Sequence, residues 1–282
     1  MYKVEFEAKL QERLNKPQTW KEICNVIYTN ARYVNVPYMT TASVPSGTTG
    51  TRGTAYAYVD YELTGQVMDI GSSKIVPLLV DRADLAQCTY LRQMEIADLE
   101  GTVLNEAVET AMLTASISAT DVGISGGVIG AGTGAITVSS VNIDDIVRGI
   151  KRMINKANGQ DVAARNGIFF VWRPEDMELL EAFAQANGFS LADAALKNGI
   201  NDGYHLMGAD HYISNSLTSP HLFAGVKKLM TVGILTDTYG KLIINQDPGQ
   251  LSAVGYVTRV DYGTLIPTLS LPLLYDINVS AV

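Results

Sequence analysis

The chain has 282 residues, of which 47% are hydrophobic and 18% are charged, with a net charge of -8 at pH 7. This composition is typical of a globular protein and excludes the disordered, collagen-like and disulfide-scaffold classes. The acidic balance argues against a protein that binds nucleic acid tightly, because such proteins neutralise phosphates with Lys and Arg.

The lack of a recognisable targeting signal and the positions of the two cysteines predict a reducing compartment. Gly, Pro or charged residues interrupt each apolar stretch before it reaches the roughly 18 residues of a membrane span. The N-terminus lacks the basic-then-apolar order of a signal peptide, so we expect the protein to be made and kept in a cytoplasm. Cys24 and Cys88 fall in apolar periodic segments, which predicts reduced core thiols rather than a disulfide or zinc site.

The N-terminal region is periodic at first and then loses its pattern. Helical spacing of apolar residues predicts two helical pieces within residues 4–34, broken at Pro17, which we interpret as an N-terminal arm. From Val34 to Thr54 the chain is rich in Pro, Gly, Ser and Thr, which predicts a loop or linker.

Two extended runs follow. Strict alternation from Thr54 to Leu63 predicts a strand, and Lys74 to Val80 predicts a second one. Turn-rich residues at Thr64-Gly65 and around Gly71 lie between them, so we expect a long hairpin that needs a neighbour to lie on. Pro77 is compatible only with an edge strand or a bulge.

A very long helix is predicted next. Asp81 and Asp84 are expected to open it, and its apolar pattern continues to about Ser116. At ~1.5 Å per residue it would be roughly 50 Å long, with Gly101 as the expected bend.

A Gly-, Ser- and Thr-rich stretch, residues 118–135, then leads to an expected short strand, Ala135–Val138. Asn142 is predicted to cap another helix. Acidic residues at its start and basic residues later in it match the helix dipole; they are Asp144, Asp145, Arg148, Lys151, Arg152 and Lys156.

The rest of the chain reads as a mixed α/β middle followed by a β-rich end. Ile168–Trp172 predicts a buried strand, and a helix is expected from Arg173-Pro174 to Asn187-Gly188. A further helix is expected near Leu191–Lys197. The remaining expected strands are His211–Ser214, Leu222–Ala224, Leu242–Asn245, Ser252–Val260 and Leu273–Val279.

This order of parts resembles the major capsid proteins of tailed bacteriophages (Caudoviricetes) that have the Hong Kong 97-type fold. The similarity covers nearly the whole chain. Local matches are the segment from Lys74 into the long helix, Gly167-Ile-Phe-Phe-Val-Trp-Arg-Pro-Glu-Asp-Met, and Leu206-Met-Gly-Ala-Asp-His-Tyr-Ile-Ser-Asn-Ser-Leu ahead of His221-Leu-Phe-Ala-Gly-Val-Lys.

The resemblance implies an α+β fold with five segments. They are an N-terminal arm (1–45), an extended E-loop hairpin (46–80), a peripheral or P-domain with a spine helix and a strand (81–139), a mixed α/β axial or A-domain (140–246), and returning P-domain strands (247–282).

The same resemblance implies that the chain is a structural, non-catalytic shell protein. Hexamers and pentamers of it would close into an icosahedral shell around packaged double-stranded DNA, without sequence-specific binding, a cofactor, a metal or a membrane. Assembly is expected in the bacterial host cytoplasm, and the final location is the virion. The expected partners are copies of itself, a separate scaffolding protein and a portal, with a cement protein left open.

The resemblance also implies which residues contact neighbouring subunits. In the E-loop they are Tyr56, Tyr58, Tyr61, Leu63, Val67 and Ile70, and in the N-terminal arm they are Phe6, Leu10, Trp20 and Ile23. Lys74 is the only Lys of the E-loop, and we expect no covalent crosslink through it.

Two glycine-rich motifs offer enzymatic alternatives. Gly123-Ile-Ser125-Gly-Gly127 matches a nucleophile elbow, with His205, His211 or His221 and Asp202 or Asp210 as conceivable partners. An elbow needs a strand before it and a helix after it, so a flexible loop is the better interpretation. The loose dinucleotide fingerprint at residues 130–135 likewise continues as an expected strand rather than a helix.

Three weaker alternatives complete the interpretation. His205, Asp210 and His211 lack the spacing typical of a metal site. Lys227-Lys228 could contact packaged DNA, although a solvated pair is the commoner case. The second shell hypothesis is an encapsulin-like compartment of the same fold that encloses a cargo enzyme.

Overall fold

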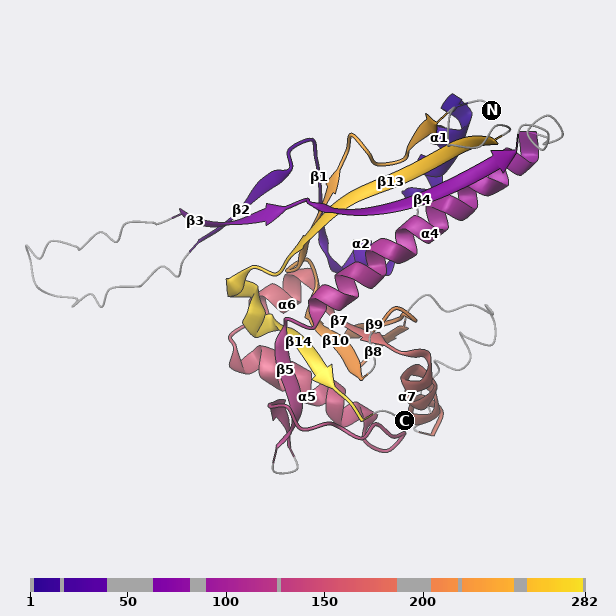
Figure 1. The fold of residues 1–282 in the computed structure, drawn as a ribbon. Coiled ribbons are helices and arrows are strands. Elements are labelled where there is room, and N and C mark those ends of the chain that lie inside the picture. Colours follow the sequence, from indigo (N-terminus) through magenta and orange to yellow (C-terminus); the bar gives the residue numbers. More distant parts are fainter. Residues whose placement is uncertain are drawn as a thin grey trace, which may run out of the picture.

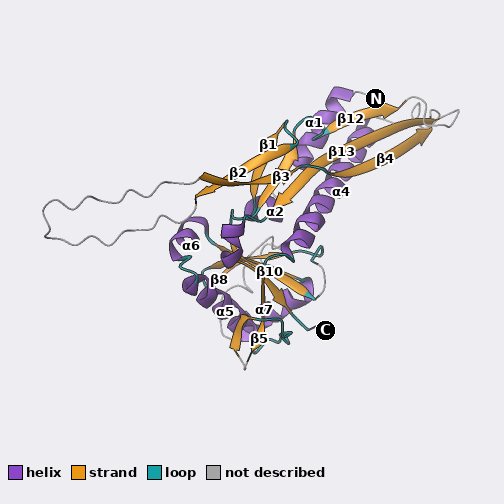
Figure 2. Ribbon diagram, turned by 60° about the vertical axis from the view of Figure 1, so that its left-hand side comes forward, coloured by secondary structure: helices purple, strands orange, loops and turns teal. Residues whose placement is uncertain are grey.

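The computed structural model describes residues 3–15, 18–39, 63–81, 90–125, 128–186, 204–217, 220–245 and 253–280. These residues form an elongated upper lobe and a compact lower lobe, with a two-stranded arm projecting from the upper lobe (Figure 1). Figure 2 shows the same division from another side.

A five-stranded sheet forms the upper lobe. Its long central strand, β13 (Ala253–Leu265), pairs with β4 (Ser72–Asp81) on one side and with β11 (Thr231–Leu235) and β12 (Lys241–Asn245) on the other; β1 (Asn25–Thr29) lies parallel to β11. β4 is an edge strand among the described residues, so the prediction for Pro77 is confirmed.

Helix α4 (Tyr90–Ser116) covers one face of this sheet and packs on β13 and β4. Residues 82–89, where the helix was expected to start, lie outside the described residues. Helix α1 (Lys3–Leu14) packs in turn on α4. Gly101 lies at this crossing, where a Cβ atom would come within 2.9 Å of the Arg13 side chain, so the missing side chain lets the two helices approach.

A seven-stranded sheet forms the lower lobe. Its order is β6 (Val128–Ala131), β5 (Thr120–Ser125), β14 (Leu274–Asn278), β10 (His221–Val226), β7 (Ile168–Trp172), β9 (Ala209–Ile213) and β8 (Tyr204–Leu206). Helices α5 (Ile143–Lys156), α6 (Gln160–Asn166) and α7 (Pro174–Ala186) and the short 3₁₀ helix η1 (Thr268–Leu273) accompany it. Helix α5 buries an apolar stripe and pairs Arg148 with Asp144 and Asp145 on its outer side, as expected for an amphipathic surface helix.

The structure corrects the predictions for the N-terminal region. The second helical piece ends early, because α2 spans only Thr19–Ile23 and the chain continues as β1. The β-branched and aromatic residues of β1 favour a strand, and a short apolar run cannot distinguish the two periodicities. The predicted linker begins with another strand, β2 (Tyr33–Met39), in which Pro37 lies on a two-stranded ribbon.

The described part of the predicted hairpin differs from the prediction. Residues 54–62 lie outside the described residues, and the chain before β4 forms β3 (Leu63–Asp69), which includes the expected turn at Thr64-Gly65. β3 pairs with β2, from Tyr33 opposite Asp69 to Met39 opposite Leu63, whereas β4 pairs with β13. Partners so distant in sequence leave no local signal.

Further along the chain, the predictions for β7, α7, β9, β10, β12, β13 and β14 are confirmed within a few residues. The strand expected at Ala135–Val138 is reduced to one bridge between Ile136 and Val279, and β5 and β6 form before it instead. Asn142 precedes α5, but its amide oxygen accepts hydrogen bonds from Ser139 rather than capping the helix. The helix expected near Leu191–Lys197 lies outside the described residues.

The two sheets do not follow the five expected segments. β11 and β12 lie in the expected A-domain segment but join the sheet of β4 and β13. β14 lies in the expected C-terminal P-domain strands but joins the lower sheet, together with β5. The chain therefore crosses between the lobes more often than the segment scheme implies.

Candidate assembly surface

No described element covers one face of the upper sheet. The register places Pro77, Val257 and Ile243 opposite one another, and their neighbours two residues away point to the same side. Leu242, Thr258 and Val76 point to the other side, where α4 lies; Leu242 and Thr258 are fully buried.

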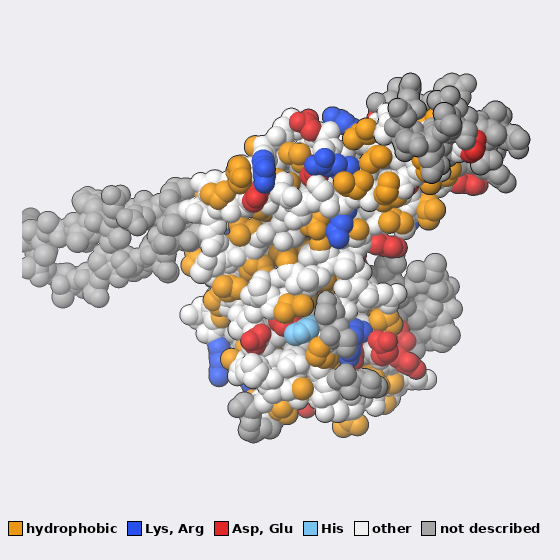
Figure 3. Space-filling model, in the orientation of Figure 1, with side chains coloured by type: hydrophobic (Ala, Val, Ile, Leu, Met, Phe, Trp, Pro, Cys, Tyr) orange, Lys and Arg blue, Asp and Glu red, His pale blue; other side chains and the backbone are white. Residues whose placement is uncertain are grey.

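We call this uncovered apolar set the outer row; it comprises Ile75, Pro77, Leu79, Ile243 and Val257. Ile75, Leu79 and Ile243 are 53%, 49% and 53% exposed. Such large aliphatic side chains side by side on one face are typical of a contact surface. Figure 3 shows hydrophobic side chains gathered over this part of the upper lobe.

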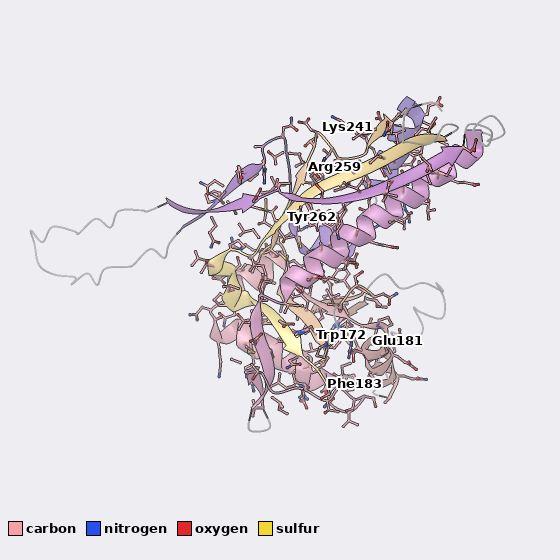
Figure 4. The ribbon with its side chains drawn as sticks, in the orientation of Figure 1. Trp172, Glu181, Phe183, Lys241, Arg259 and Tyr262 are labelled. Atoms are coloured by element: carbon pink, nitrogen blue, oxygen red, sulfur yellow. The ribbon has the colours of Figure 1, made fainter. Side chains whose placement is uncertain are left out.

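Charged and polar side chains lie next to the outer row. Arg259 and Lys241 lie beside Ile75 in the register, and Figure 4 shows both on the upper sheet. The Arg259 Nε lies 2.7 Å from the Asp261 carboxylate, which also accepts a hydrogen bond from Ser73. Burial alone would raise the pKa of Asp261, but these hydrogen bonds hold it below its ordinary value. The Asp261 carboxylate therefore stays ionised and fixes Arg259 at the edge of the row.

The arm presents a second exposed face. Tyr33 and Val67 are 59% and 63% exposed, whereas Met68 and Ile70, on the opposite face, are almost fully buried. The base of the arm is held by Gln66, whose side-chain amide donates to the Thr268 hydroxyl and accepts from the Thr268 N–H. The exposed face therefore projects from a fixed base.

Other exposed apolar side chains are distributed over both lobes. Leu99 and Val103 lie on the outer side of α4, while Ile124, Val128 and Val141 belong to the lower lobe. Surfaces of this kind on several sides are expected of a subunit with several neighbours.

The predicted contact residues of the N-terminal arm lie elsewhere. Phe6, Leu10, Trp20 and Ile23 are at most 1% exposed and belong to the core of this chain. Their helical stripe is covered by the chain itself, because α1 packs on α4 and β12. The prediction that these four side chains contact a neighbour is therefore wrong.

The E-loop predictions divide into three groups. Tyr56, Tyr58 and Tyr61 lie outside the described residues, as does the side chain of Leu63. Val67 is exposed on the arm. Ile70 is buried against β11, near Gly233, so its predicted contact with a neighbour is wrong. Sequence reasoning missed Ile75, Leu79 and Ile243, whose alternation was visible but whose uncovered side depends on the position of α4.

The enzymatic motifs lack the required geometry. β5 ends at Ser125 and the next element is strand β6, so no helix follows the elbow motif. The fingerprint glycines at 130–134 are followed by the bridge at Ile136, and the next helix begins only at Ile143. Neither motif has the helix N-terminus on which its chemistry depends.

The histidines and paired lysines have partners within the chain. His205 bonds Asp210, His221 bonds Asp276, and buried His211 accepts a hydrogen bond from the Trp172 indole. Within the described ranges, no three His, Cys, Asp or Glu side chains are grouped to hold a metal ion. The Lys227 side chain is mostly buried and bonds Tyr212, so the interpretation as a solvated pair is wrong for this residue, whereas Lys228 is exposed and bonds the carbonyls of Lys21 and Cys24. No helix among the described residues is long and apolar enough to cross a membrane.

No family model and no curated protein sequence matches the chain. Solved structures do match. The capsid chain of an empty GTA particle aligns with a TM-score of 0.64 and 15% identity, over 95% of this chain and 96% of that chain. A chain of Mycobacterium phage Che8 aligns with a TM-score of 0.62 and 18% identity, over 88% and 85%.

A virus-like particle from Pyrococcus furiosus aligns with a TM-score of 0.58 and 12% identity, over 98% of this chain and 99% of that chain. At such identities the likeness is one of fold, and it extends over nearly the full length of each chain. The elongated sheet with its long helix, the projecting arm and the compact α/β lobe are thus the parts of one known architecture: the chain has the Hong Kong 97-type capsid fold.

Proposed function

We propose that this chain is the major capsid protein of a tailed bacteriophage, a structural subunit that builds a closed icosahedral shell. The observation that carries the proposal is the nearly full-length match to the capsid chain of the GTA particle. The outer row supports it independently, because its aliphatic side chains stay in water unless a second subunit covers them.

Many weak contacts would hold the shell together. Apolar surface buried between subunits contributes about 25 cal/mol per Å², and a closed lattice repeats each contact in every copy. The outer row and the exposed face of the arm are the surfaces that we assign to these contacts. Hexamers and pentamers built from one subunit would then close the shell.

The domain names follow this proposal with altered boundaries. We assign the upper lobe to the P-domain, with α4 as its spine helix, and the lower lobe to the A-domain. The E-loop would correspond to the arm that β2 and β3 begin. β4 belongs to the P-domain sheet under this assignment, so Lys74 lies in that sheet rather than in the arm.

The contents and partners of the shell form a second part of the proposal. With a net charge of -8, the protein would enclose double-stranded DNA without adhering to it, so that the genome can leave again. A separate scaffolding protein and a portal would assist assembly in the host cytoplasm. The role in the virion is structural rather than catalytic.

An encapsulin-like compartment is the second candidate. The match to the virus-like particle from Pyrococcus furiosus over 98% of the chain favours it specifically. In that case the shell would enclose a cargo enzyme instead of a genome.

Electron microscopy of the protein expressed with and without its neighbouring genes tests both candidates. A phage coat should give shells that carry nuclease-protected DNA when the packaging genes are present. A compartment should give shells without DNA that retain a co-expressed enzyme. A compact monomer at high concentration, even beside its scaffolding protein, would overturn both.

A further inference from the structure

The chain passes from the lower to the upper sheet through a short crossover, residues 227–230, between β10 and β11. Two consecutive backbone amides in it bond to different lobes. The Lys227 N–H donates to the Gly167 carbonyl of the lower lobe at 3.0 Å. The Lys228 N–H donates to the Ile23 carbonyl at the end of α2 at 2.6 Å. The crossover is therefore a joint that is bonded on both sides.

The Lys227 side chain strengthens the lower side of this joint. Its Nζ lies 2.6 Å from the Asp210 carboxylate and 2.6 Å from the Tyr212 hydroxyl, and the side chain is 15% exposed. Burial alone would lower the pKa of Lys227, but these two partners raise it. The Tyr212 hydroxyl then donates to Glu22 of α2 at 2.9 Å, so the network continues into the upper lobe.

The Lys228 side chain closes the upper side. Its Nζ donates to the carbonyl oxygens of Lys21 at 2.7 Å and Cys24 at 2.9 Å, which satisfies the C-terminal end of α2. Lys228 has a φ of 64°, in the left-handed region that residues other than glycine rarely adopt. Such a conformation persists only where the surroundings hold it, and here three hydrogen bonds do so.

We propose that these five residues, Glu22, Asp210, Tyr212, Lys227 and Lys228, form a clasp that fixes the angle between the two lobes and thereby the curvature of the shell. The proposal rests on the shell function. In a closed lattice every copy repeats the shape of the subunit, so a small change in the angle between the lobes is repeated at every position. A looser clasp would let neighbouring subunits adopt different angles.

Two variants test the clasp without removing apolar packing. Lys227→Met keeps the length of the side chain but loses the ion pair. Lys228→Asn tolerates the left-handed backbone but cannot reach the carbonyls of α2. Lys156→Met, at the exposed C-terminal end of α5, is the matched control for the loss of one positive charge. Circular dichroism and thermal unfolding verify that each variant is folded.

The first readout is hydrogen exchange at two amides of the joint. One is Asn25, whose N–H donates to the Met230 carbonyl of the crossover at 2.8 Å, and the other is residue 228. Both should exchange at least about tenfold faster in the clasp variants than in the control. The second is the distribution of particle diameters in micrographs. We expect shells of mixed diameter and open shells from the clasp variants, and uniform shells from the wild type and Lys156→Met. Uniform shells from variants whose amides exchange faster would overturn the proposal.

The test also separates the clasp from the shell function. If the wild type forms no shells, the proposed function fails. Small-angle scattering of the purified subunits then tests the clasp, because a freer angle between the lobes should broaden the distribution of interatomic distances. Scattering profiles identical to that of the wild type would show that the clasp does not set the angle.

Discussion

Glu100 lies in the middle of α4 with 4% of its surface exposed, on the side that faces β13. Its carboxylate lies next to the hydroxyl of Thr258, which is itself fully buried on β13. Burial raises its pKa to about 7, and the neighbouring Thr258 hydroxyl only partly opposes the shift. A carboxyl group in the apolar layer between helix and sheet is an unusual feature that helical periodicity alone did not reveal.

This burial predicts a pH dependence of stability. Because the folded-state pKa is above the ordinary value of 4.5, the folded protein binds the Glu100 proton more tightly than the unfolded chain does. The contribution to stability is complete below about pH 4.5 and is lost as the pH rises to 7 and above. Between pH 5 and pH 8 the free energy of unfolding should therefore fall less in Glu100→Gln than in the wild type. The two decreases should differ by more than about 1 kcal/mol.

Urea unfolding at the two pH values measures this difference. Glu106→Gln, at an exposed position of the same helix, is the control and should follow the wild type. Parallel pH profiles for Glu100→Gln and the wild type would contradict the prediction.

For Cys24, the sequence alone correctly predicted the environment of the side chain. The apolar segment predicted a core thiol, and Cys24 is fully buried, with its pKa raised by burial to about 12. Cys88 lies outside the described residues.

At the scale of the elements, two glycines allow the base of the arm to pack closely on the upper sheet. Gly233 of β11 and Gly263 of β13 pair directly with each other. A Cβ atom on Gly233 would come within 2.4 Å of the Met68 side chain, and one on Gly263 within 2.3 Å of the Asp69 carbonyl oxygen. Together they form a flat seat for the base of β3, which fixes the direction in which the arm leaves the upper lobe.

Gly263→Ala should therefore displace the base of the arm. The added methyl group would meet backbone rather than a flexible side chain, so we expect a loss of about 1–3 kcal/mol in the free energy of unfolding. Gly130→Ala is the control, because a Cβ atom there has no neighbour within 4 Å. Denaturant unfolding compares the two variants, and equal midpoints would disprove the role of the seat.

The outer row leads to a prediction about assembly. Ile75→Lys combined with Leu79→Lys places two charges on a face that is already half exposed, so the subunit should fold normally. The charges would oppose burial against a second subunit, and shells should be reduced at least about tenfold. Thr114→Lys combined with Gln160→Lys adds the same charge at other exposed positions.

Sedimentation of assembled particles against free subunits measures the effect. If the outer-row variant assembles as well as its control, this face is not a subunit contact.

At the scale of the whole molecule, the arm can be tested as a unit. Deleting residues 56–76 would remove all of β3 and the first half of β4, and so damage the upper sheet. Met39 and Leu63 are direct partners at the described end of the ribbon, so an Asn-Gly turn can join them in place of residues 40–62. The shortened subunit should keep its fold and remain soluble without forming shells.

Size-exclusion chromatography and micrographs measure this outcome. Far-ultraviolet circular dichroism unchanged from the wild type would show that the lobes are intact. Normal shells from the shortened subunit would refute the role of the arm in assembly.

The sequence by itself determined the types of most elements and their order. Periodicity alone indicated the long helix α4, the strand β7 and the β-rich end, and helix signals such as Pro174 placed the start of α7. These features depend on side chains within a few residues of one another. The resemblance of this order, and of three local segments, to known capsid proteins led to the prediction of the Hong Kong 97-type fold.

Only the tertiary structure decided which elements pair and which faces are left uncovered. β4 pairs with β13 from Ser72 opposite Tyr262 to Asp81 opposite Ala253, partners that no local pattern links. The apolar stripe of Phe6 and Leu10 is compatible in sequence with a contact to a neighbouring subunit or with a contact inside this chain. In the structure both side chains are buried, and their helix packs on α4. A sequence pattern indicates that a face is apolar. Which residues cover that face depends on contacts between residues far apart in the chain.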